Sequence, residues 1–185
     1  MSRTVRQAKT TEPNSKGPGI IHLRKQTGVQ ASPQEVFDLV SDLSRHAELA
    51  GSGEVQRVRK LTEGPVSVGT RFEADEDIPL RKGNVKRRRF VAHSEVLEYD
   101  PPRVISWKST PPGGGKPPLI QWWFRLSPEG RSTRVVHELK ITADGAGPVT
   151  RFIMGNLARL LRKGPIERGM EQTLANLRQM LGEQD

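Results

Sequence analysis

Between residues 54 and 143 the chain alternates short strand-forming segments with turn residues, and an amphipathic helix follows them. Successive strands joined by turns at short intervals are typical of an antiparallel meander. The strands expected from the period-two pattern are 55–61, 69–76, 89–99, 104–107, 120–126 and 133–141. This region is therefore predicted to form one antiparallel sheet of about six strands.

The helix after these strands carries one continuous apolar stripe. Its apolar residues recur at steps of three and four, which places them on one helix face. The stripe consists of Ile166, Met170, Leu174, Leu177 and Leu181. A similar stripe occupies 153–161, and Gly164 and Pro165 separate the two. The helix is thus either kinked at this point or begins again with Pro165 in its first turn.

The segment before the meander predicts one strand and two short helices. Strand character begins near Gly19 and continues to Val29. Ser32, Pro33 and Glu35 then have the spacing of a capping box with proline at the first helical position. One helix is expected from Pro33 to about residue 43, and a shorter one over 44–49. The predicted order is strand, two short helices, about six strands and a long helix, an α+β architecture.

The composition of the chain limits the classes of protein and the cellular compartments to which it can belong. It carries 30 basic and 21 acidic residues, a net charge of +9, and only 34% hydrophobic residues. Residues 1–18 contain almost nothing to bury and are expected to be a disordered basic tail, which leaves a single domain over 19–182. No apolar run approaches the ~18 residues of a membrane span, and the lack of cysteine excludes disulfides and thiolate metal sites. A cytoplasmic protein is the expectation.

Five segments in this order resemble the START / birch-pollen-allergen (SRPBCC) superfamily, in particular its polyketide cyclase/dehydrase-like branch. They are 31–46 (ASPQEVFDLVSDLSRH), 68–72 (VGTRF), 99–105 (YDPPRVI), 132–136 (STRVV) and 174–178 (LANLR). The resemblance spans about residues 20–181. It implies the helix-grip fold: a curved antiparallel sheet of about six to seven strands wrapped around a long C-terminal helix. Because similar proteins bind lipids, sterols, quinones or polyketides, and some are cyclases or hydrolases, it implies a cavity but no particular reaction.

Strand alternation predicts which side chains face that cavity. Charged positions are expected to face water, and the alternate positions to face inward. The expected lining is Phe72, Ile105, Trp107, Trp122, Phe124, Val135 and His137 from the strands, opposite Met154, Leu157 and Leu161 from the helix. Such a wall fits a flat or long apolar ligand, but aromatic residues also serve simply to pack a sheet on a helix. The segment 89–99 gives no clean alternation, so either His93 or Ser94 is the inward candidate there.

Two ionisable residues, His137 and Glu76, are expected on the inward face and are the catalytic candidates. A buried histidine beside a carboxylate can act as an acid or base near neutral pH. The alternative is a hydrogen-bonded core histidine, with Glu76 in water beyond the sheet edge. No residue resembles an activated nucleophile, and the four histidines are too scattered to indicate a metal site. No cofactor is expected.

A basic run without an intervening acidic residue is the sharpest surface feature. It consists of Arg81, Lys82, Lys86, Arg87, Arg88 and Arg89. Such a run fits phosphates, anionic lipid headgroups or an acidic protein partner, and equally a solvated hairpin. Aromatic residues make up 5% of the chain and none lies within the run, which argues against nucleic acid.

These features leave three functional hypotheses. The first is a non-enzymatic module that carries a hydrophobic small molecule such as a lipid, quinone or polyketide. The second is an enzyme, a cyclase or dehydratase acting on a polyketide-like substrate. The third is an interaction protein that binds an acidic partner through its basic surface. The first is the preferred hypothesis because the resemblance implies a cavity.

Overall fold

The computed structural model describes residues 21–79, 87–110, 119–142, 147 and 162–182. The strands are β1 (Ile21–Val29), β2 (Val55–Lys60), β3 (Arg71–Pro79), β4 (Arg87–Asp100), β5 (Val104–Thr110), β6 (Leu119–Glu129) and β7 (Ser132–Thr142). The helices within these ranges are α1 (Pro33–Ser41), the 3-10 helix η1 (Leu43–Arg45), α2 (His46–Leu49) and α4 (Lys163–Met180). The predicted tail and the apolar stripe at 153–161 lie outside the described residues.

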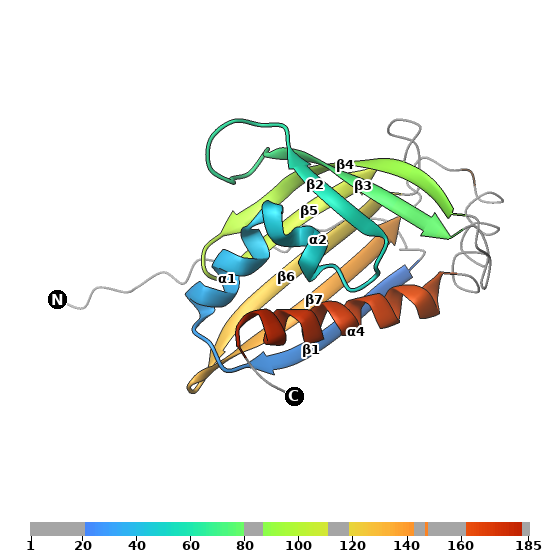
Figure 1. Ribbon diagram of the computed structural model, residues 1–185. Helices are drawn as coiled ribbons and strands as arrows, with labels where there is room; N and C mark the ends of the chain where they lie inside the picture. Colours follow the sequence, from blue (N-terminus) through green and yellow to red (C-terminus); the bar gives the residue numbers. More distant parts are fainter. Residues whose placement is uncertain (1–20, 80–86, 111–118, 143–146, 148–161, 183–185) are drawn as a thin grey trace.

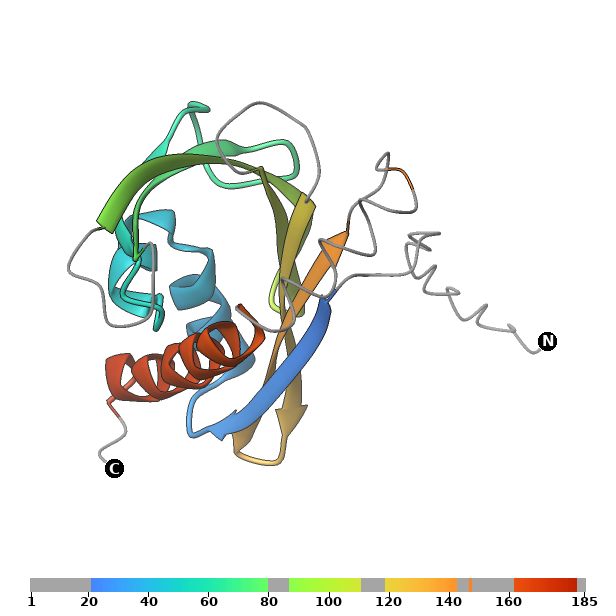
Figure 2. The ribbon, with the colours of Figure 1, turned by 90° about the vertical axis from the view of Figure 1, so that its right-hand side faces the viewer.

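The seven strands form one sheet in the order β1-β7-β6-β5-β4-β3-β2, and every neighbouring pair is antiparallel. Figures 1 and 2 show that the sheet curves into an arch, with α1, α2 and α4 on its concave side. The α+β class, the antiparallel curved sheet and the C-terminal helix that it surrounds are therefore confirmed.

Helix α1 begins where the capping box predicts. The Ser32 hydroxyl accepts a hydrogen bond from the Glu35 backbone N–H at 3.3 Å, and the Glu35 carboxylate accepts from the Ser32 N–H at 2.8 Å. Together these bonds satisfy two N–H groups that a helix start leaves without partners. Asp42 ends α1, and its carboxylate accepts from Ser44 N–H at the start of η1. The two short helices that follow thus turn the chain back toward the sheet.

Strand β4 contains an irregularity that reverses its alternation. Its pairing with β5 shifts between Val96 and Glu98. One extra residue in a strand moves every later side chain to the opposite face. Val96, before the shift, is buried in the core, and because of the shift Tyr99, three residues later, faces the same side and packs edge-on against Phe37 of α1 at 5.3 Å between ring centroids. This shift explains why the sequence of this segment has no single alternation.

One end of the concave face is filled by the packing of α1 and the second half of α4. Phe37 of α1 is fully buried there together with Ile105, Val135, Leu174 and Leu177. The first half of α4 has fewer large residues that face the sheet, and Pro165 stands in its first turn. None of the described helices is long and apolar enough to cross a membrane.

Candidate ligand-binding cavity

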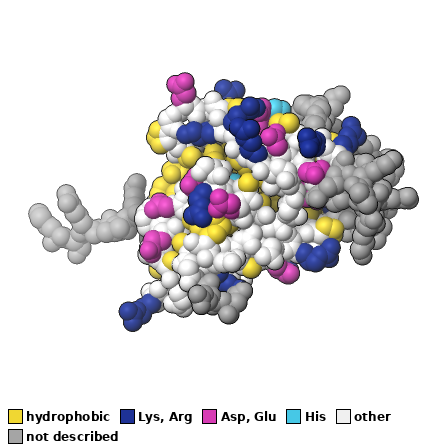
Figure 3. Space-filling view, in the orientation of Figure 1, with side chains coloured by type: hydrophobic (Ala, Val, Ile, Leu, Met, Phe, Trp, Pro, Cys, Tyr) yellow, Lys and Arg dark blue, Asp and Glu magenta, His cyan; other side chains and the backbone are white. Residues whose placement is uncertain are grey.

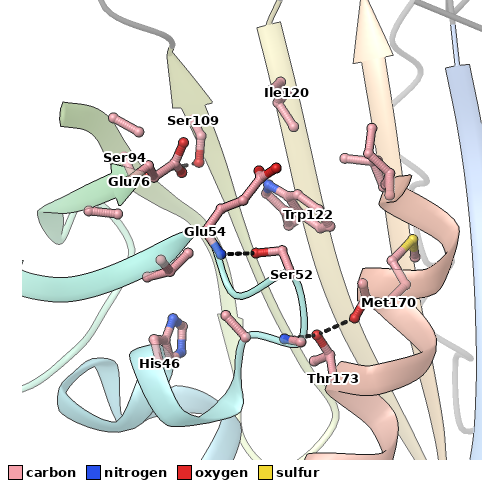
Figure 4. A pocket seen from close by; sticks show the side chains of 18 of the residues that line it. His46, Ser52, Glu54, Glu76, Ser94, Ser109, Ile120, Trp122, Met170 and Thr173 are labelled. Atoms are coloured by element: carbon pink, nitrogen blue, oxygen red, sulfur yellow. Dashed lines mark hydrogen bonds between the residues drawn. The ribbon is translucent and has the colours of Figure 1, made fainter. Parts of the chain in front are cut away.

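A cavity of about 430 Å³ lies between the first half of α4 and the concave face of the sheet. Strands β2 to β7 all contribute to its wall, and so do Leu49 at the end of α2 and the α2–β2 segment, residues 50–54. Figure 4 shows this arrangement, with α4 on one side and the strands behind. A volume of this size is typical of sites for small organic ligands.

Small side chains at inward positions leave this space open. Ala74 of β3 pairs directly with Ala92 of β4, and Ser94 of β4 pairs with Ser109 of β5. All four line the cavity. Residues of this size cannot span the gap to α4, whereas Ile105 and Val135 fill the corresponding space at the other end. The cavity is therefore a consequence of residue size at positions whose direction is set by strand alternation.

Aromatic rings cover much of the wall. The ring centroid of Trp107 lies 6.3 Å from that of Phe72, 6.1 Å from that of Phe124 and 5.3 Å from that of His46. Trp122 lines the cavity on the neighbouring strand. Aromatic rings at these separations pack favourably and present flat apolar faces. The wall thus suits the hydrocarbon part of a ligand.

The polar groups of the cavity are a pair of hydroxyls on β4 and β5 and a group of charged side chains beside the start of β2. The hydroxyl groups of Ser94 and Ser109 lie 2.9 Å apart. Glu54 accepts two hydrogen bonds from Arg162, which stands just before α4, at 3.1 and 3.3 Å. Glu76 is half-buried, and burial, together with the nearby Glu54 carboxylate, raises the pKa of its carboxyl group against a smaller opposite effect of Arg162. This part of the wall can therefore recognise a polar group on a ligand.

His137 lies in the cavity wall but is almost completely enclosed. Its ring stacks on that of Phe124 at 4.3 Å and on that of Trp122 at 5.5 Å. Its Nδ1 atom is buried without a hydrogen-bond partner among the described residues. Burial lowers the pKa of this imidazole to about 3, although the Met170 carbonyl opposes the shift. His137 is thus a neutral ring near pH 7.

His46, at the start of α2, is a cavity residue that sequence analysis did not select. Its Nε2 lies 2.9 Å from the Val40 carbonyl oxygen. Because a carbonyl oxygen only accepts hydrogen bonds, Nε2 carries the hydrogen, and Nδ1 of the neutral ring is an acceptor. Burial lowers the pKa of this histidine, which favours the neutral form. The sequence marks it only as a histidine within the short helix expected over 44–49, which is too short for a periodicity that would show it as inward.

The expected cavity residues divide into three groups. Phe72, Trp107, Trp122, Phe124 and His137 lie on the cavity wall. Ile105 and Val135 face inward but belong to the filled core instead. Met154, Leu157 and Leu161 lie outside the described residues. The expected catalytic pair is not brought together, since β4, β5 and β6 stand between Glu76 on β3 and His137 on β7 and no hydrogen bond or ion pair joins them.

A close contact between the α2–β2 segment and α4 closes one side of the cavity. The Gly51 N–H donates to the Thr173 hydroxyl at 2.9 Å, and that hydroxyl donates to the Gly169 carbonyl at 2.9 Å. One turn further along α4, the Asn176 side-chain amide donates to the Glu48 and Leu49 carbonyl oxygens. These bonds tie the end of α2 and the residues after it to α4 over two turns, and Figure 4 shows the two that Thr173 makes.

The basic run is only partly described. Arg81, Lys82 and Lys86 lie outside the described residues, and Arg87 is placed as the first residue of β4. Arg88 and Arg89 are exposed, and the Arg88 guanidinium lies 5.1 Å from the ring centroid of Phe90, a cavity residue. On the face seen in Figure 3, Lys and Arg side chains are interspersed with Asp and Glu. An anionic partner for this run stays a prediction.

Comparison with protein families matches this geometry. The family described as polyketide cyclase / dehydrase and lipid transport matches residues 21–182. The chain belongs to this family. No curated protein matches the chain. Membership in the polyketide cyclase / dehydrase and lipid transport family agrees with a fold that binds hydrophobic ligands, and it confirms the resemblance found in the sequence.

Solved structures show the same fold at low sequence identity. A protein from Thermus thermophilus is 22% identical, with a TM-score of 0.59 and coverage of 86% of this chain and 95% of that one. The Zhui aromatase/cyclase from Streptomyces sp. R1128 is 14% identical, with a TM-score of 0.59 and coverage of 87% and 95%. Major latex-like protein 151 from Panax ginseng is 12% identical, with a TM-score of 0.57 and coverage of 88% and 97%. At these identities the likeness establishes the fold alone.

Proposed function

We propose that this protein binds a hydrophobic small molecule in its internal cavity and acts as a carrier or sequestering protein. One observation carries the proposal: a space of about 430 Å³ whose wall is mainly apolar and aromatic. Burial of apolar ligand surface there would contribute about 25 cal/mol per Å² before the cost of ordering the ligand. Lipids, quinones and polyketides are the candidate classes, and the family description includes both lipid transport and polyketide chemistry.

The environment of His137 favours a carrier over an acid–base enzyme. A general acid or base works best when its pKa lies near the working pH. Burial holds the pKa of His137 at about 3, and the two neighbouring aromatic rings enclose it. We therefore expect His137→Phe to bind ligand about as tightly as the wild type. A cyclase that used His137 to move a proton would instead lose its turnover in this variant.

A cavity-filling substitution gives a direct test of the proposal. Ala92→Phe places a large ring in the cavity from β4, whereas Val91→Phe adds the same residue type at the preceding, exposed position. Native mass spectrometry of gently purified protein, followed by denaturing extraction, should find a discrete apolar ligand in the wild type and in Val91→Phe. We expect Ala92→Phe to have lost it. Equal occupancy in all three proteins, or no binding of added lipids, quinones or polyketides, would refute the proposal.

A further inference from the structure

The described part of the cavity wall carries more acidic than basic side chains. Among the described residues that line it, Glu54 and Glu76 carry carboxylates and Arg162 carries the one guanidinium. Figure 4 shows the Glu54 and Glu76 side chains directed into the cavity, Glu54 from the residue just before β2 and Glu76 from β3. Arg162 is already paired with Glu54 through two hydrogen bonds. Among the described residues Glu76 has no hydrogen bond or ion pair, and the one nearby cation, Arg162, is already bound to Glu54.

Apart from Glu54, Glu76 and Arg162, the described lining of the cavity consists of aromatic, aliphatic and neutral polar residues. Strand β4 presents Phe90 and Ser94 to the cavity, and β5 presents Trp107 and Ser109. The two histidines of the wall, His46 and His137, have lowered pKa values because they are buried. Aromatic faces attract cations through the ring quadrupole. A carboxylate that has no ion-pair partner in the described part of the chain, in a cavity with aromatic walls, suits an organic ammonium group.

This inference rests on the proposed function. From the geometry we infer that the apolar molecule bound in the cavity carries a basic nitrogen, which pairs with Glu76 while its hydrocarbon part lies against the aromatic wall. A half-buried carboxylate loses hydration, and a cation within contact distance compensates that loss. A ligand carboxylate in the same place would face Glu54 and Glu76, and like charges at short range repel. The site therefore discriminates against fatty acids.

The titration of Glu76 agrees with this arrangement. Burial raises the pKa of its carboxyl group, the Glu54 carboxylate raises it further, and Arg162 lowers it. An ammonium group at the site would stabilise the ionised form and lower that pKa again. By linkage, amine binding must release a proton wherever Glu76 is protonated in the free protein. The affinity for an amine should consequently increase as the pH rises through the pKa of Glu76.

Three probes with one ring system test the inference: naphthylmethylamine, naphthylmethanol and naphthoate, which are cationic, neutral and anionic near neutral pH. Calorimetry with the full-length protein should show the amine binding about tenfold more tightly than naphthoate, with the alcohol between them. Glu76→Gln should remove most of this difference and leave the affinity for the alcohol nearly unchanged. Glu54→Gln should raise the affinity for naphthoate, because it removes one carboxylate and releases Arg162.

Glu73→Gln provides the matched control. It removes the same charge from the same strand, but Glu73 points to the outer face, where it pairs with Arg59. This variant should keep the wild-type preference for the amine. If naphthylmethanol binds and the amine has no advantage over naphthoate, or if Glu76→Gln keeps the full advantage, the inference is overturned while the proposed function stands. If none of the three probes binds, the inference is overturned, and the native mass spectrometry of the wild type, Val91→Phe and Ala92→Phe decides the proposed function separately.

Discussion

Replacement of Gly51 by alanine is expected to lower the free energy of unfolding by about 3 kcal/mol, a large effect for the addition of one methyl group. A Cβ atom at this position would lie 2.3 Å from the Thr173 backbone nitrogen and 2.5 Å from the Gly169 carbonyl oxygen. Both are backbone atoms of α4, so no side-chain rotation relieves the overlap. The segment would have to move away from α4 and lose the Gly51–Thr173 hydrogen bond.

Gly28→Ala is the control for this substitution. Gly28 lies on β1 and is exposed, and a Cβ atom added to it would have no other atom within 4 Å. Its replacement should change the free energy of unfolding by less than about 0.5 kcal/mol. Urea unfolding of the two variants and the wild type measures the difference. If Gly51→Ala were as stable as Gly28→Ala, the close approach of the α2–β2 segment to α4 would not exist in solution.

Gly51 also illustrates what sequence patterns do not reveal. In the sequence, Gly51, Ser52 and Gly53 mark only the end of a short helix. The contact of Gly51 and Ser52 with Gly169 and Thr173 joins segments more than 110 residues apart, and no local pattern encodes such a distance. Alternation, by contrast, is local. It placed Phe72, Trp107, Trp122 and other inward residues of the strands on the concave face, because the direction of a side chain depends only on its position along a regular strand.

Direction alone does not separate a cavity from a filled core. Ile105 and Val135 face the same side of the sheet as Trp107 and His137, yet α1 and the second half of α4 pack over them. The distinction depends on which helix covers each part of the sheet. A usable signal was residue size: Ala74, Ala92, Ser94 and Ser109 place small side chains in adjacent positions across three strands. Two of these positions, Ala92 and Ser94, precede the shift in β4, but the residues after the shift are out of phase with them, so the strand as a whole shows no single period-two pattern.

The second large effect concerns acid stability and His137. Its pKa is about 3 in the folded protein, against about 6.5 for an unperturbed histidine. At a pH below the pKa of His137 in the unfolded chain, the unfolded chain binds a proton that the folded protein does not accept. Folding is thereby destabilised progressively as the pH falls from about 6.5 toward 3, by about 1.4 kcal/mol per pH unit. At about two units below the unfolded pKa, the cost from this residue reaches about 3 kcal/mol.

His137→Phe should remove this acid sensitivity at little cost near neutral pH. The buried Nδ1 makes no hydrogen bond to other described residues, and a phenyl ring can keep the stacking on Phe124 and Trp122. We expect the two proteins to differ by less than about 1 kcal/mol near neutral pH, because a ring of similar size replaces the imidazole. At lower pH the variant should become the more stable protein. Urea unfolding at a series of pH values measures this difference.

The comparison between the two proteins isolates His137 from the other titrating groups. His46 has a lowered pKa and adds to the loss of stability in acid, whereas the raised pKa of Glu76 acts in the opposite direction. Both residues are present in the wild type and in the variant, so their effects cancel in the difference. A difference that stays constant between neutral pH and about two units below would mean that folded His137 takes up a proton readily. His137 could then serve as an acid near neutral pH, and the argument for a carrier over an acid–base enzyme would fail.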